Sequence, residues 1–171
     1  GQYELVNVAQ IDLLPDTIVD GQIIDGNHVS DCISRVFSEQ KIQGQQIATS
    51  LSGNAVIVKK INLPIMGLEE LRDQINWEAQ QHIPFDIQDV NLDYHVLEGE
   101  PNSEMMDVLL VACKKDMVSQ LTQVIAQAGK TTSIVDVDSF ALQNAYEVNY
   151  SPNPDQTVVL LNIGASVTNI N

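Results

Sequence analysis

One segment near the C-terminus has residue types that could bind phosphate. Residues 162–168 read Asn-Ile-Gly-Ala-Ser-Val-Thr and directly follow an apolar run, residues 158–161. A glycine and small side chains at the end of a strand let backbone N–H groups approach an anion, and hydroxyl groups add further donors. The same residues also fit a plain β-turn between two strands. Taken alone, the segment is therefore either a phosphate loop or an ordinary turn.

The sequence gives little support for a metal site or for a nucleophilic active site. The three histidines, His28, His82 and His95, have no metal-ligand spacing with one another or with the cysteines. A Gly-x-Ser-x-Gly nucleophile motif is absent. We therefore predict no catalytic residue and no metal site in this chain.

Composition narrows the classes of partner. The chain has 171 residues, enough for one sizeable domain or two small ones, and 44% of them are apolar. Its formal net charge of −15 repels phosphate backbones and anionic lipid, which argues against direct binding to nucleic acid or to a membrane surface. No stretch approaches the ~20 apolar residues of a membrane helix. Cys32 and Cys113 lie within apolar patterns, so we predict two free buried thiols and a reducing, cytoplasmic location.

The elements around the candidate loop follow from hydrophobic periodicity. Residues 3–13 alternate as a strand, a helix begins at Asn27 as its cap, and residues 47–51 form a short strand. The middle of the chain reads strand–helix–strand–strand–helix, a compact α+β unit that ends at Gly129. Its first helix is predicted by an amphipathic stripe of Leu68, Leu71, Ile75, Ala79 and Ile83, and the strand after it by the alternation of apolar and polar residues over 90–96. A strand, a helix and a further strand follow, at residues 133–137, 139–148 and 157–163. The last of these is uniformly apolar around residues 158–161, which predicts a central strand covered on both faces.

A resemblance to a known family rests mainly on the middle of the chain. Residues 77–85, Trp-Glu-Ala-Gln-Gln-His-Ile-Pro-Phe, resemble a signature of PilM-like proteins of type IV pilus assembly, and residues 56–61, 90–94 and 109–115 fit the same family. Residues 136–142 and 162–168 are similar, in that order, to the first connecting segment and second phosphate loop of the wider actin, Hsp70 and hexokinase superfamily. By this resemblance the chain is identified as part of a PilM-like protein.

The resemblance implies a mixed α/β fold. Residues 1–53 and 130–171 would form part of an actin-like (ribonuclease H-like) core subdomain, 1A. Residues 54–129 would form an inserted SHS2-like subdomain, 1C, as in FtsA. The chain begins with Gly1 rather than methionine, so we expect a piece of a longer protein. The first phosphate loop and the adenosine-binding half would then lie outside it.

The same resemblance implies ATP and magnesium as cofactors of the full-length relatives. The candidate phosphate contacts that remain here are Asn162, Gly164, Ala165, Ser166 and Thr168. Asn162 replaces the aspartate that helps to hold the water shell of magnesium, and a neutral amide attracts a cation less. We therefore expect this chain to bind no cofactor and to show no appreciable ATP hydrolysis.

Two further residues depart from the superfamily pattern or fit it only loosely. Val167 stands where a hydroxyl residue is common. Asp138 falls where Hsp70-like members carry a glutamate near the attacking water, but an N-cap before Ser139 explains it more simply.

The expected partner is the short cytoplasmic tail of PilN, an inner-membrane protein, in a groove between subdomains 1A and 1C. Such a partner would hold the chain at the inner membrane from the cytoplasmic side without lipid contact. Ile83, Pro84 and Phe85 are candidate groove residues, although core packing explains them more simply, and Trp77 is predicted to be buried. Other pilus inner-membrane proteins and self-association are further expectations. The alternatives are an FtsA-like nucleotide-dependent polymer and the cytoplasmic domain of a type II secretion scaffold.

Overall fold

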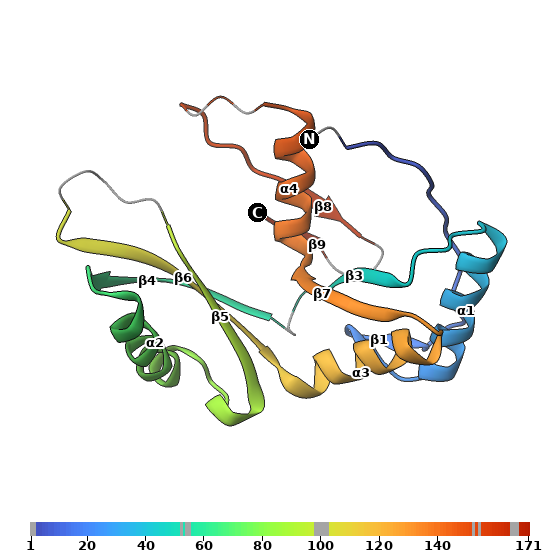
Figure 1. The fold of residues 1–171 in the computed structure, drawn as a ribbon, viewed down its shortest axis with the longest axis horizontal. Helices are drawn as coiled ribbons and strands as arrows, with labels where there is room; N and C mark the ends of the chain where they lie inside the picture. The colour runs from blue at the N-terminus through green and yellow to red at the C-terminus, as the bar shows by residue number, and fades with distance from the viewer. Residues whose placement is uncertain are drawn as a thin grey trace. The chain divides into compact units, whose positions relative to one another are not determined.

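The computed structural model describes residues 3–51, 53, 56–97, 103–151, 153, 155–164 and 168–171. The chain forms two compact units (Figure 1). Unit 1 comprises Gly1–Gly53 with Val118–Asn171, and unit 2 comprises Asn54–Met117. The second boundary lies before the position expected from sequence, Gly129. The helix between these two points packs within unit 1, where a Cβ atom placed on Gly26 would lie 3.1 Å from Val124 Cγ2.

In its described residues, unit 2 is one α-helix on a three-stranded antiparallel sheet. The strand order is β4 (Val56–Pro64), β6 (Met105–Lys114), β5 (Val90–Val96). Helix α2 (Leu68–His82) lies against one face of this sheet, and a 3₁₀ turn, η2 (Ile87–Asp89), precedes β5 (Figure 1). The predicted order of these elements is confirmed.

The core of unit 2 joins α2 to the sheet. Leu71, Ile75 and Ala79 are four residues apart along the helix, so they share one face, and each is at most 2% exposed. The buried cluster is Ile61, Leu63, Leu71, Ile75, Ala79, Ile83, Val90, Met106, Val108, Leu110 and Ala112. The helical stripe predicted from sequence is confirmed at these positions, except that Leu68 is 76% exposed.

Trp77 is not the buried anchor that the sequence analysis predicted, because 58% of it is exposed. It lies two residues after Ile75, about 200° further around the helix. That rotation turns it away from the buried stripe. Leu71, Ile75 and Ala79 together determine which side of the helix faces the sheet, and the preference of one tryptophan for burial does not change that.

The described residues of unit 1 form three separate strand pairs. Strands β3 (Gln46–Leu51) and β7 (Thr131–Val137) are parallel. The antiparallel pairs are β1 (Ile18–Val19) with β2 (Gln22–Ile23), and β8 (Leu161–Ile163) with β9 (Thr168–Ile170). The helices are α1 (Gly26–Glu39), α3 (Lys115–Gln127), whose first turn belongs to unit 2, and α4 (Asp138–Asn149).

Two predictions for the N-terminal part of unit 1 are wrong. Residues 3–13 are not a strand: the segment has no ladder partner among the described residues, and Tyr3, Leu5 and Val6 are more than 80% exposed. Alternating side chains become a strand only where the backbone finds a neighbour to pair with. Helix α1 is capped by Asp25 rather than Asn27, because the Asp25 carboxylate accepts a hydrogen bond from the His28 amide at 3.0 Å.

The prediction of a covered central strand at residues 157–163 is also wrong. Only Leu161–Ile163 forms a strand, and Val159 and Leu161 are 68% and 56% exposed. Strand β8 pairs with β9 alone among the described residues. The uniformly apolar run predicted buried side chains, but Val159 and Leu161 are exposed in the described part of the chain.

One buried polar atom in β7 leads to a stability prediction. Thr132 Oγ1 is buried and has no hydrogen-bond partner among the described residues. A buried hydroxyl without a partner loses its hydration without compensation. We expect Thr132→Val to raise the free energy of unfolding by about 1 kcal/mol, measured by urea denaturation. The neighbouring, exposed Thr131→Val is the matched control, and an equal gain from both variants would contradict this explanation.

Candidate functional site

The candidate phosphate segment forms a β-hairpin. In the register of β8 and β9, Asn162 lies opposite Asn169 and Ile163 lies opposite Thr168. The hairpin therefore brings Gly164 and Thr168 together near its turn, with Asn162 one pair further back, and all three are exposed. Ala165, Ser166 and Val167 lie outside the described residues. Both the phosphate-loop and the plain-turn interpretation contain such a hairpin, so phosphate contact at these residues stays a prediction.

Asp138 is placed differently from its predicted role as an N-cap. It is the first residue of α4, the N-cap position is Val137, and no side chain caps the helix there. The Asp138 carboxylate instead accepts a hydrogen bond from the hydroxyl of Ser50 near the end of β3. Ser50 escaped the sequence analysis because 88 residues separate it from Asp138. Parallel pairing of β3 and β7 brings the carboxyl ends of both strands to one edge, and this decides the contact.

The three candidate peptide-binding residues have different environments. Ile83 is 4% exposed and belongs to the core cluster of unit 2. Phe85 is partly buried against that core, and Pro84 is exposed. The surface that remains for a ligand at this point is therefore formed by Pro84 and Phe85.

A cavity of about 600 Å³ lies beside these two residues, entirely within unit 2. The Lys114 ammonium is 4.3 Å from the centre of the Phe85 ring, a cation–π contact. The Lys115 ammonium donates a hydrogen bond to the Gln88 carbonyl oxygen at 2.7 Å. The lining residues are Pro84, Phe85, Asp86, Asp89, Lys114, Lys115 and Asp116. We call this the Phe85 cavity.

Two of the carboxylates in the Phe85 cavity are ordered by local hydrogen bonds. Asp86 caps η2, where its Oδ1 accepts from the Gln88 amide at 2.9 Å. Asp116 Oδ1 accepts from the Met117 amide at 2.8 Å. Such a set of aromatic, aliphatic and charged groups can bind a side chain, but it contains no nucleophile paired with a base. The cavity is suited to recognition rather than to a reaction.

The sequence analysis missed the charged residues of the Phe85 cavity because they lie on two separated segments. Residues 84–89 follow α2, whereas Lys114 ends β6 and Lys115 and Asp116 begin α3. Pairing of Val90 with Lys114 in the sheet brings the two segments together. The only signal in the sequence was the concentration of charge at the end of each segment.

The cysteines differ in burial. Cys32 is buried as predicted, with its sulfur 3.6 Å from His28 Nε2. Cys113, which precedes Lys114 in β6, is only partly buried, and the prediction of full burial is wrong there. Cys113 lies close to the end of β6, where the sheet gives way to α3. Burial, and then the negative charge of Asp116, raise the pKa of the Cys113 thiol above its usual value.

This raised pKa predicts slow alkylation of Cys113. In a Cys32→Ser background, iodoacetamide at pH 8 should modify Cys113 more slowly than it modifies a cysteine in an unstructured peptide, because less thiolate is present. Asp116→Asn should speed the reaction at pH 8, and Asp73→Asn should not, because Asp73 is exposed on α2, which packs on the sheet face opposite Cys113. Rates followed by mass spectrometry test this, and equal rates for both variants would contradict it.

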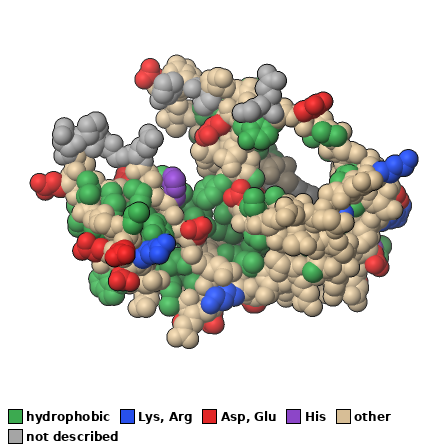
Figure 2. All heavy atoms as spheres, viewed as in Figure 1, with side chains coloured by type: hydrophobic (Ala, Val, Ile, Leu, Met, Phe, Trp, Pro, Cys, Tyr) green, Lys and Arg blue, Asp and Glu red, His purple; other side chains and the backbone are tan. Residues whose placement is uncertain are grey.

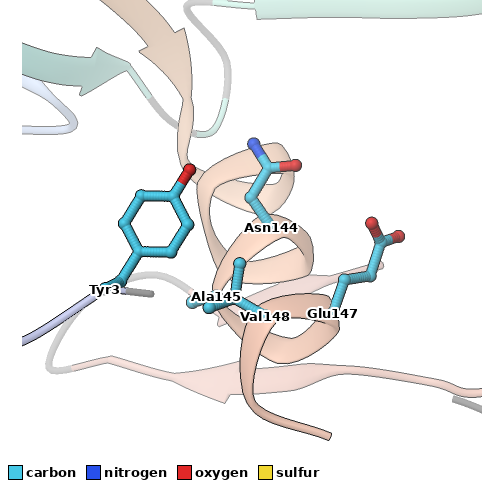
Figure 3. A pocket seen from close by; sticks show the side chains of 5 residues that line it. All are labelled: Tyr3, Asn144, Ala145, Glu147 and Val148. Atoms are coloured by element: carbon cyan, nitrogen blue, oxygen red, sulfur yellow. The ribbon is translucent and has the colours of Figure 1, made fainter. Parts of the chain in front are cut away.

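A second hollow of about 600 Å³ lies within unit 1 on the side of α4. Tyr3 faces Asn144, Ala145 and Val148 there, with Glu147 at the edge (Figure 3). One carboxylate and one phenol do not make a catalytic set. Across the ranges that the structure describes, no three His, Cys, Asp or Glu side chains gather as a metal ion requires.

Acidic side chains are more frequent than basic ones on the visible surface (Figure 2). Figure 2 shows carboxylates spread over this face, with fewer Lys and Arg side chains among them. This distribution agrees with the net charge of −15. Every helix in the described part of the chain is too short or too polar to span a bilayer.

Comparison with protein families shows to which family the chain belongs. The family described as type IV pilus assembly protein PilM matches residues 1–171, the whole chain. The chain belongs to the PilM family. The family resemblance predicted from residues 77–85 and the neighbouring segments is therefore confirmed.

Two solved structures show where the PilM-family fold recurs. One is the PilM–PilN type IV pilus biogenesis complex, with 27% identity and a TM-score of 0.85 over 95% of this chain and 49% of that chain. Another is the cytoplasmic domain of EpsL from the type II secretion system of Vibrio cholerae, with 16% identity and a TM-score of 0.51. It is matched over 84% of this chain and 52% of that one. At that identity the likeness to EpsL shows the fold alone.

These matches confirm the expected fold class, a mixed α/β structure with part of an actin-like core. The chain spans about half the length of the solved structures that it matches.

Proposed function

We propose that this chain is a docking module of type IV pilus assembly that binds the N-terminal cytoplasmic tail of a PilN protein. The observation that carries the proposal is the match, at 27% identity and over 95% of the chain, to a PilM that was solved in a complex with PilN. Unit 2 would serve as subdomain 1C and unit 1 as part of subdomain 1A. Pro84 and Phe85 would contribute to the peptide surface.

The surface charge supports recruitment by a peptide rather than by lipid. A chain with a net charge of −15 is repelled by anionic headgroups, so a protein partner that is itself anchored in the membrane would have to hold it at the inner membrane. The protein would then act from the cytoplasmic side.

Calorimetric titration with a synthetic peptide tests this function directly. The peptide carries the N-terminal cytoplasmic sequence of the PilN from the same genome, and a scrambled peptide of equal composition is the control. We expect saturable one-to-one binding of the native peptide and no saturation with the scrambled one. Absence of binding by a folded sample, or equal binding of both peptides, would refute the proposal for this chain.

We also propose that ATP and magnesium are cofactors of the full-length protein and that this chain alone does not hydrolyse ATP. Asn162 offers a neutral amide where relatives in the superfamily use a carboxylate, which weakens the attraction for magnesium. Phosphate release from ATP should therefore equal that of a buffer blank. Turnover that Gly164→Val or Asn162→Ala abolishes would overturn this expectation.

A further inference from the structure

We propose that the Phe85 cavity receives a basic side chain, arginine or lysine, of the docked peptide. This inference rests on the proposed function, because it names the chemistry by which one part of the peptide would be recognised. It is carried by the aromatic ring, by the three carboxylates and by the positions of the two lysines.

The Phe85 ring already shows an affinity for a cation. Lys114 extends its ammonium to 4.3 Å from the ring centre, where the negative face of an aromatic ring attracts positive charge. Pro84 adds apolar surface next to the ring. A long basic side chain could therefore lay its methylene groups on Pro84 and Phe85 while its charged end stays in the polar part of the cavity.

The carboxylates would hold that charged end. Asp86, Asp89 and Asp116 line the cavity, and no salt bridge to any of them occurs within the described residues. Asp86 and Asp116 each use one carboxylate oxygen for a backbone amide, which leaves the other oxygen available to a guest. An arginine could satisfy more than one of them, because its guanidinium carries five donors.

The two lysines do not cancel this attraction. The Lys115 ammonium is held by the Gln88 carbonyl oxygen, and the Lys114 ammonium lies over the ring. Three carboxylates against two ammonium groups leave the lining with an excess negative charge, in a chain whose net charge is already −15. A basic guest is therefore favoured over an acidic one.

The volume also fits recognition of a peptide side chain. About 600 Å³ lies within the range of small-molecule sites, roughly 300–1,000 Å³. One arginine does not fill it, so neighbouring atoms of the peptide or water would share the space.

The test compares two triple variants that remove the same amount of charge. The site variant carries Asp86→Asn, Asp89→Asn and Asp116→Asn. The control carries Asp73→Asn, Asp93→Asn and Glu104→Gln, which are exposed carboxylates of unit 2 outside the cavity. Asparagine retains an oxygen acceptor for the backbone amides, so the fold should be kept, and circular dichroism checks this. Each variant is titrated with the PilN tail peptide at low and at high salt.

We expect the site variant to bind the peptide about tenfold more weakly at low salt, and the control to bind within about twofold of the unchanged chain. A peptide whose Arg and Lys residues are replaced by glutamine should also lose affinity, and the site variant should then cause little further loss. Lys114→Ala should tighten binding, because it removes a competing cation from the Phe85 ring.

Each alternative result has a distinct meaning. If the unchanged chain binds the peptide and the site variant binds equally well, this inference is wrong and the proposed function stands. If Lys114→Ala weakens binding while the site variant strengthens it, the guest is acidic and the inference is also wrong. If the unchanged chain does not bind the peptide at all, the proposed function fails and the inference fails with it.

Discussion

Replacing Ile75 with alanine should lower the free energy of unfolding of unit 2 by about 3 kcal/mol. Ile75 is 2% exposed and lies at the centre of the stripe by which α2 packs on the sheet. Truncation removes buried methyl and methylene groups and leaves a cavity that rigid strands cannot close, and such changes cost about 2–5 kcal/mol. Because the buried cluster in the described part of unit 2 is centred on this helix–sheet contact, the loss should be near the middle of that range.

Urea denaturation followed by fluorescence measures this effect in the intact chain. Trp77 is the only tryptophan, and it lies on α2, so its emission reports on unit 2. Leu68→Ala is the matched control: it also shortens an aliphatic side chain on α2, but Leu68 is 76% exposed, so the change should be within about 0.5 kcal/mol. Similar losses from the two variants would mean that α2 does not pack through the stripe described above.

Replacing Gly129 with alanine should lower the free energy of unfolding of unit 1 by about 1–2 kcal/mol. Gly129 follows α3 with φ +75°, in the left-handed region, where a Cβ atom meets the next carbonyl oxygen. Its amide donates to the Ala126 carbonyl oxygen at 2.9 Å, and the Lys130 amide donates to that of Ile125 at 3.1 Å. These two bonds form a Schellman motif, which requires the left-handed residue.

The position of Lys130 explains why the chain cannot easily avoid that strain. The Lys130 ammonium donates to the Gly44 carbonyl oxygen at 2.6 Å and lies 4.5 Å from the centre of the Phe37 ring. Relaxing the turn would displace these contacts. Gly44→Ala is the control, since a Cβ atom there meets nothing within 4 Å and no left-handed conformation is needed. Far-UV circular dichroism during thermal unfolding measures both variants, and an equal change in Tm would contradict this account.

Local sequence patterns predicted most of the elements of unit 2. The stripe of Leu71, Ile75 and Ala79 predicted α2, and the alternation of residues 90–96 predicted β5. These patterns succeed because a helix that packs on a small sheet has one apolar face. Its apolar side chains therefore recur along the sequence with the period of the helix. The family followed from a different signal, the resemblance of residues 77–85 to a signature of PilM-like proteins.

The same patterns failed where burial depends on a neighbour distant in sequence. Residues 3–13 alternate but find no partner strand in the described part of the chain, and the apolar residues Val159 and Leu161 remain exposed. The burial of Trp77 was predicted wrongly for a different reason. The general preference of tryptophan for burial was given more weight than the position of Trp77 around the helix. Each error comes from predicting burial or strand pairing from residue type, although both depend on which other segments lie nearby.

The sequence by itself determined the family, the mixed α/β class, the acidic character and the elements that carry the candidate residues. Only the tertiary structure decided which of those residues come together. Antiparallel pairing of β5 with β6 places Asp116 and Lys114 beside Phe85, and parallel pairing of β3 with β7 places Ser50 against Asp138. The physical reason is that strand pairing joins segments through backbone hydrogen bonds that are common to all residues, so side-chain sequence alone does not specify the register that brings a site together.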